Sequence, residues 1–172
     1  MLSDEQKKWI NHLSDSDRIK IYPYDPYSSV KFDKIAKKIR SILPQATIEL
    51  HGAAALKISG QKEIDVYIPV SPANFDGNTN KISMIFGKPK SYYFLQRARF
   101  VDYIGKTKAE VFVINKECDQ WINCLKFENY LIKNQNMLKK YEELKKRGHN
   151  LNVREYYCHK IEFINSIILN KK

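Results

Sequence analysis

Apolar residues near the start of the chain recur at helical spacing, with one strand-like interruption. A helical repeat over residues 3–13 predicts a short first helix behind a cap-like serine. Alternation over residues 19–23 predicts a brief strand. A second, longer helix is expected between a cap at Ser28 or Ser29 and a stop at Pro44, because apolar residues there recur at helical spacing among lysines. Its single apolar stripe predicts that this helix packs on a sheet.

Strand-like alternation dominates the middle of the chain. Residues 47–50 and 63–68 are predicted to be the two central strands of a sheet. A short helix is predicted at residues 82–86, behind a polar loop and ahead of a glycine and a proline. Three more segments rich in β-formers add an antiparallel portion to the sheet: residues 92–95, 98–104 and 110–114, the last two joined by a hairpin at residues 105–107.

After Asp119 the apolar spacing becomes helical again and predicts three successive helices. The expected fold class is therefore α/β (α+β), with a mixed sheet flanked by helices and a C-terminal helical segment packed on it. No linker or internal repeat divides the chain, so residues 1–172 are expected to form one domain. Within it, residues 1–117 contain the sheet and residues 118–172 the C-terminal helices.

Two carboxylates share one face of the strand predicted at residues 63–68. Glu63 and Asp65 stand two positions apart, so their side chains point the same way. Adjacent carboxylates repel unless a cation lies between them, and their hard oxygen atoms suit Mg²⁺. A third carboxylate would complete such a site; Glu110 is the best placed, and Asp102 is the alternative. The competing interpretation is that Glu63 and Asp65 lie on the solvent face of an edge strand and bind no metal.

A small-residue turn precedes that strand and is a candidate phosphate site. Small residues let backbone N–H groups approach phosphate oxygens closely, which makes candidates of Gly52, Ala53 and Ala54. Lys62, directly before the acidic strand, and His51, at the mouth of the turn, are further phosphate candidates. His51 is equally compatible with a structural role.

Two arginines form a second pair at strand spacing. Arg97 and Arg99 could present two guanidinium groups to a triphosphate from one face of their strand. Structural ion pairs with acidic residues are the alternative. Tyr92 and Tyr93 could stack on a base, but core packing is the favoured interpretation of such aromatic pairs.

Composition narrows the class of protein. Lysine and arginine outnumber aspartate and glutamate by 30 to 19, a net charge of +11, which favours nucleotides or nucleic acids as partners, with solvated helix surfaces as the alternative. Three cysteines without paired spacing are expected to be reduced thiols, which predicts a cytoplasmic location: Cys118, Cys124 and Cys158. The sequence contains no secretory signal and no apolar run long enough for a bilayer, so no membrane association is expected.

Several short motifs in a fixed order resemble the GrpB-like family of the polymerase-β-type nucleotidyltransferase superfamily. In the first half they are Tyr24-Asp-Pro-Tyr27, a helix, His51-Gly-Ala-Ala-Ala55 and the acidic strand. In the second half they are Leu125-Lys-Phe-Glu-Asn-Tyr-Leu131, Tyr141-Glu-Glu-Leu-Lys145, Tyr156 with Lys160, and Phe163-Ile164. The resemblance runs from about residue 19 to residue 168.

The resemblance implies a nucleotidyltransferase fold with a Gly-Ser turn and a strand of the D-x-D type. Gly52 matches that turn, but Ala53 stands where the resemblance implies a serine, and the first acid is Glu63. The lost hydroxyl removes one hydrogen bond available to a phosphate.

The leading hypothesis is an Mg²⁺-dependent enzyme that transfers a nucleotidyl group from a nucleoside triphosphate to RNA or another acceptor. Glu63, Asp65 and Glu110 would hold the metal and carry catalysis. The alternative is a non-catalytic module that binds a nucleotide or nucleic acid in the same place, which the Ala53 substitution favours. A third hypothesis is an interaction protein that uses the C-terminal helices.

Overall fold

The computed structural model describes residues 1–169, and their contacts group into two compact units. The sheet unit contains residues 24–57 and 62–124. The helical unit contains residues 1–23, residues 58–61 and the described chain from Leu125 onward. The organisation as a single domain stays a prediction.

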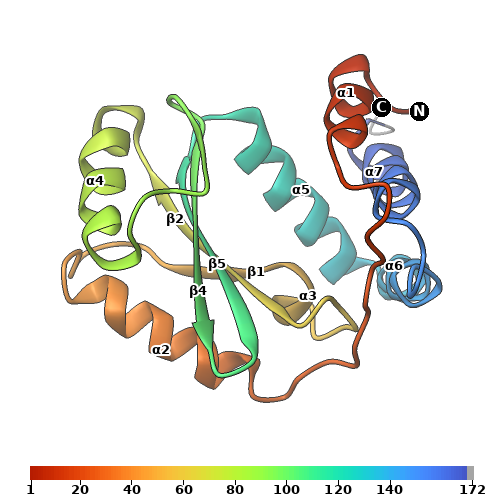
Figure 1. Ribbon diagram of the computed structural model, residues 1–172, viewed down its shortest axis with the longest axis horizontal. Helices are drawn as coiled ribbons and strands as arrows, with labels where there is room; N and C mark the ends of the chain where they lie inside the picture. Colours follow the sequence, from red (N-terminus) through yellow and green to blue (C-terminus); the bar gives the residue numbers. More distant parts are fainter. Residues whose placement is uncertain (170–172) are drawn as a thin grey trace. The chain divides into compact units, whose positions relative to one another are not determined.

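A five-stranded mixed sheet forms the centre of the sheet unit (Figure 1), which confirms the expected fold class. Along the sheet the strand order is β1-β2-β5-β4-β3. β2 and β5 run parallel, whereas every other neighbouring pair is antiparallel. The expectation that the strand before Gly52 is central was wrong, because β1 pairs only with β2 and forms an edge. The bounds are β1 Glu49–His51, β2 Glu63–Val70, β3 Ser91–Tyr93, β4 Arg97–Ile104 and β5 Thr107–Asn115.

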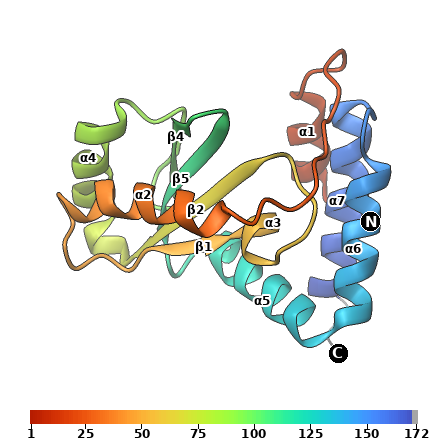
Figure 2. The same ribbon diagram turned by 90° about the horizontal axis from the view of Figure 1, so that it is seen from below.

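Strict alternation along β2 separates an apolar face of the sheet from a polar one. Ile64, Val66 and Ile68 are fully buried, whereas the residues between them are only partly buried. The helices α2 (Ser28–Arg40) and α4 (Phe75–Phe86) pack on the apolar face and contact each other (Figures 1 and 2). Because this face carries the core, the polar side chains of β2 are directed to the opposite face of the sheet.

The start of α2 differs from the expected serine cap. Neither Ser28 nor Ser29 caps the helix, because the preceding Asp-Pro-Tyr turn orders the chain instead. The Asp25 carboxylate accepts a hydrogen bond from the backbone N–H of Tyr27 at 2.9 Å, and the Ser28 hydroxyl donates to the Asp25 carbonyl at 2.7 Å. The Asp25 side chain therefore orders the turn before α2, and no side chain caps the helix itself.

The helix α4 begins earlier than the sequence indicated. The prediction placed its start at residue 82, but α4 starts at Phe75, directly after the 3-10 turn η1 (Pro72–Asn74). Phe75, Thr79 and Ile82 are buried at helical spacing. Their burial overrides the turn preference of the Asp-Gly-Asn sequence.

Helices make up most of the helical unit. They are α1 (Asp4–Asn11), α6 (Gln135–Arg147), α7 (Val153–Ile168) and the later part of α5 (Asp119–Lys133), so the three predicted C-terminal helices are confirmed. Residues 19–23 do not form the predicted strand; Arg18 and Tyr22 make isolated bridges only. None of the helices within residues 1–169 is both long and apolar enough to cross a membrane.

The segment at residues 58–61 joins the helical unit through Glu142 on α6. The Glu142 carboxylate accepts hydrogen bonds from the Ser59 backbone N–H at 3.1 Å and from the Ser59 hydroxyl at 2.9 Å. Burial by itself would raise the pKa of Glu142, but these hydrogen bonds and the nearby Lys146 ammonium hold that pKa below its ordinary value. These hydrogen bonds fix residues 58–61 against α6.

A methyl group at Gly148 is expected to destabilise the helical unit. A Cβ there would lie 2.3 Å from Cδ2 of the Tyr156 ring, which is fully buried and cannot swing into solvent. We expect Gly148→Ala to lower the free energy of unfolding by about 1–3 kcal/mol, the usual cost of overpacking.

The matched control is Gly77→Ala in α4, where a Cβ would meet no atom within 4 Å. This control should raise the free energy of unfolding by about 0.5–1 kcal/mol, because alanine is the better helix former. Urea denaturation of both variants measures the difference. Equal stability of the two variants would contradict the expected contact with Tyr156.

Candidate functional site

Three carboxylates converge on the polar face of the sheet. Glu63 and Asp65 lie on β2, and the parallel register with β5 sets Asp65 directly opposite Glu110. One carboxylate oxygen from each residue lies within 4.8 Å of the others, and all three residues are partly buried. β2 has a neighbouring strand on each side, so the alternative, in which Glu63 and Asp65 lie on the solvent face of an edge strand, was wrong. The geometry that the two-residue spacing indicated is therefore present.

Asp102, the other candidate for a third carboxylate, lies elsewhere. On β4 it is one position removed from Val101, which pairs with Glu110, so its side chain points to the opposite face. Its carboxylate accepts a hydrogen bond from the Lys38 ammonium at 2.6 Å. Of the two candidates, only Glu110 joins the pair on β2.

Lys108 lies within the acidic cluster, and the sequence interpretation missed it. The register of β2 and β5 sets it opposite Glu63, and its Nζ lies 2.7 Å from a Glu63 oxygen and 2.8 Å from a Glu110 oxygen. Partial burial opposes protonation, but the hydrogen bonds to Glu110 and Glu63 raise the pKa of Lys108 well above its ordinary value. The side chain is therefore a charged ammonium. Lys108 stands two residues before Glu110, so both side chains lie on one face of β5, and this spacing is the signal in the sequence that could have found it.

The two arginines on β4 have different surroundings. The guanidinium of Arg99 donates a hydrogen bond to Glu110 at 2.6 Å, the ion pair that the sequence interpretation gave as an alternative. The guanidinium of Arg97 lies over the rings of Tyr93 and Phe112, at 5.3 and 5.7 Å from their centres. Arg99 therefore belongs to the acidic cluster, whereas Arg97 lies on an aromatic surface beside it.

Gly52 brings the backbone close to Asp65. The chain leaves β1 at His51 and enters the single helical turn α3 (Gly52–Ala55), at the place where the sequence indicated a small-residue turn. Gly52 has a φ of +70°, and a Cβ at this position would lie 2.2 Å from a carboxylate oxygen of Asp65. Only glycine allows both this conformation and this approach. Ala53 and Ala54 follow within α3, and the role of all three residues in phosphate binding stays a prediction.

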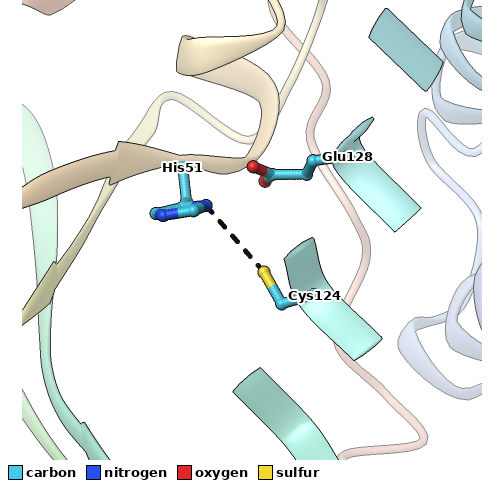
Figure 3. A group of neighbouring side chains, drawn as sticks. All are labelled: His51, Cys124 and Glu128. Carbon is cyan, nitrogen blue, oxygen red and sulfur yellow. Dashed lines mark hydrogen bonds between the residues drawn. The ribbon is translucent and has the colours of Figure 1, made fainter. Parts of the chain in front are cut away.

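His51 lies in an aromatic cluster on the same face. Its ring meets those of Tyr67 and Trp121 edge-on, each with centres 5.0 Å away, and its Nε2 lies 3.2 Å from a Glu49 oxygen. Figure 3 shows its Nδ1 directed at the Cys124 thiol, with 3.9 Å between nitrogen and sulfur. These contacts match the structural role that was the alternative for His51, and its role in phosphate binding stays a prediction.

Lys62 is exposed directly before β2, and its charge acts on Asp25. The pKa of Asp25 is lowered chiefly by a hydrogen bond from Lys31 and by the Tyr27 N–H, with a further contribution from the Lys62 charge. Lys62 also has a positive φ of 62°. Its contact with a phosphate stays a prediction.

Comparison with known proteins identifies the family of the chain. The family model described as GrpB protein matches residues 18–170. The chain belongs to the GrpB family. No curated protein sequence matches it. Among solved structures, the conserved protein GrpB from Enterococcus faecalis is similar with a TM-score of 0.66 and 17% identity, covering 87% of this chain and 97% of that one.

A second similar structure, that of a poly(U) polymerase, bears on the fold of this GrpB-family chain. The Cid1 poly(U) polymerase, in a structure with MgGTP bound, has a TM-score of 0.51 and 11% identity. The match covers 89% of this chain and 52% of the polymerase chain, so the chain spans about half of that enzyme. At such low identity the similarity shows the fold alone. The GrpB-family chain therefore has a polymerase-β-type nucleotidyltransferase-like fold, as the sequence motifs implied.

Proposed function

We propose that this GrpB-family chain binds a nucleoside triphosphate together with Mg²⁺ and transfers a nucleotidyl group to RNA or another acceptor. The observation that carries the proposal is the convergence of Glu63, Asp65 and Glu110 within 4.8 Å on one face of a nucleotidyltransferase-like sheet. The fold is also that of a polymerase whose structure has MgGTP bound.

The donor atoms of the cluster fit magnesium. Mg²⁺ prefers hard oxygen ligands and is usually held by one or two carboxylates, substrate phosphates and water. Three carboxylates within 4.8 Å of one another supply such ligands from two adjacent strands. When bound, the ion would neutralise phosphate charge and polarise the phosphoryl group that is attacked. Glu63, Asp65 and Glu110 would hold it, and the rigid pairing of β2 with β5 would keep their oxygens in position.

The remaining candidates would bind phosphate around this cluster. Gly52 lies against Asp65, so the backbone amides that begin α3 are next to the carboxylates: Gly52, Ala53 and Ala54. Arg99 is 31% exposed and already contacts Glu110, which leaves guanidinium donors for a phosphate. Arg97, Lys62 and His51 are the outer candidates for neutralising the rest of a triphosphate.

Removal of the metal is expected to stop the reaction. The protein would be incubated with each labelled nucleoside triphosphate and a single-stranded RNA acceptor, either with Mg²⁺ or with EDTA. We expect acceptor lengthening, with release of pyrophosphate, in Mg²⁺ only, because the ion would neutralise the charge that develops on the transferred phosphoryl group. Turnover that persists in EDTA would contradict the proposal, as would the absence of both turnover and Mg²⁺-dependent nucleotide binding.

A second function, a nucleic-acid-binding module without catalysis, is supported by an exposed aromatic segment. Tyr93 and Phe94 are 48% and 65% exposed, and the exposed lysines Lys88 and Lys90 shortly precede them in the sequence. Aromatic faces flanked by cations are a common way to bind single-stranded nucleic acid. In the same experiment, RNA binding that weakens steeply with salt while no nucleotide is consumed would favour this second function.

A further inference from the structure

Lys108 occupies the place in the acidic cluster where a cation is needed. The parallel register of β2 and β5 aligns it with Glu63, and the strand period directs it to the same face as Glu110. Its Nζ lies 2.7 Å from Oε1 of Glu63 and 2.8 Å from Oε1 of Glu110, so one ammonium bridges carboxylates from two strands. Arg99 is also bound to Glu110, so both Lys108 and Arg99 contact the acidic cluster.

A metal ion held by this cluster would need the oxygens that Lys108 now binds. Mg²⁺ contacts its ligand oxygens at about 2.0–2.1 Å, closer than an ammonium nitrogen can lie. An ammonium that donates to the same oxygens would then lie within a few ångströms of the ion, where two positive charges repel strongly at the low effective dielectric of a partly buried site. The metal and Lys108 therefore exclude each other.

We infer that Lys108 is the built-in counter-ion of the acidic cluster and competes with the divalent metal for Glu63 and Glu110. This inference rests on the proposed function, because it concerns the metal that the three carboxylates would hold. Lys108 has a route out of the cluster: its side chain is 32% exposed and has a flexible four-carbon stem. Metal and nucleotide enter as the ammonium withdraws into solvent, and the lysine returns when they leave.

The test measures metal binding directly, with Mn²⁺ as a paramagnetic probe. Electron paramagnetic resonance counts free Mn²⁺ in titrations of the wild type and of Lys108→Met, which removes the charge but keeps a long side chain. We expect Lys108→Met to bind Mn²⁺ at least about tenfold more tightly than the wild type, because a repelling charge is gone. Two controls should bind like the wild type: Lys108→Arg, which keeps the cation, and Lys106→Met in the exposed turn before β5.

Three outcomes are decisive. Equal Mn²⁺ affinity in the wild type and in Lys108→Met would overturn the role of Lys108 while leaving the metal site in place. Failure of both proteins to bind Mn²⁺ would overturn the proposed metal function itself, and the inference with it. Mn²⁺ binding by Lys108→Met but not by the wild type would support both the metal site and the competing role of Lys108.

Folding of the variant is followed separately, since three carboxylates without Lys108 repel each other. If Lys108→Met is destabilised, added Mn²⁺ should restore its melting temperature, and the rise should exceed that of the wild type. A melting temperature that stays low in saturating Mn²⁺ would show that Lys108 has only a structural role, which contradicts the inference.

Discussion

Asp65→Asn is expected to abolish Mg²⁺-dependent nucleotidyl transfer and to leave the protein folded. Asp65 lies at the centre of the cluster, with Glu110 opposite on β5, His51 opposite on β1 and Gly52 against its carboxylate. Asparagine keeps the shape of the side chain but removes the charge that attracts a metal ion. Metal ions contribute several kcal/mol to reactions of this kind. Since about 1.4 kcal/mol corresponds to a tenfold change in rate, we expect a loss of about 100-fold or more.

Asp102→Asn provides the matched control for that experiment. Asp102 is also an aspartate of the sheet, but it pairs with Lys38 on the opposite face. The Asp102 carboxylate is 25% exposed and its partner Lys38 is 49% exposed, so loss of this partly exposed ion pair should change stability by about 1 kcal/mol or less. Turnover should match the wild type. Measurements of nucleotide consumption and melting temperature on both variants complete the test; full turnover in Asp65→Asn would remove the cluster from the mechanism.

Local patterns were sufficient to find the acidic pair. Glu63 and Asp65 alternate with Ile64 and Val66, and alternation of this kind fixes which side chains share a face without any knowledge of neighbouring strands. Glu110 was chosen by its place, as a carboxylate near the start of another predicted strand, with Asp102 as the alternative. The convergence of all three also requires that those strands are adjacent and paired in the observed register.

The pairing of the strands could not be read from local patterns, and most errors arose there. Lys108 was missed because its ion pairs with Glu63 exist only in the parallel register of β2 with β5, a pairing between segments far apart in sequence. Tyr92 and Tyr93 were favoured as core residues, yet both are exposed, because β3 is a three-residue edge strand. Burial of such a pair requires a further neighbouring strand or helix.

Gly52 and Gly105, two of the three glycines with a positive φ among residues 1–169, give a second prediction of large effect. Gly52 has a φ of +70° and Gly105 a φ of +58°, so alanine at either position adopts a left-handed conformation that costs about 1–2 kcal/mol. Their surroundings differ. A Cβ at Gly105 meets nothing within 4 Å, whereas one at Gly52 would lie 2.2 Å from Oδ2 of Asp65.

Gly52→Ala should therefore destabilise the protein more than Gly105→Ala and should also damage the site. We expect the clash at Gly52 to cost a further 1–3 kcal/mol or so, unless the Asp65 carboxylate moves away. Movement of the carboxylate would also disturb the acidic cluster, because Asp65 can avoid the methyl group only by leaving its position beside Glu63 and Glu110. Denaturant melts would measure the stability difference, and Mn²⁺ titration would measure the site.

The comparison of the two variants separates backbone strain from contact with the carboxylate. Gly105→Ala should lose stability but bind Mn²⁺ like the wild type, whereas Gly52→Ala should lose both. If both variants bound Mn²⁺ normally, the close approach of Gly52 to Asp65 would have no part in metal binding, and the glycine of the family motif would serve the turn alone. If only Gly52→Ala lost the metal, the glycine would be needed because it leaves room for the central carboxylate of the cluster.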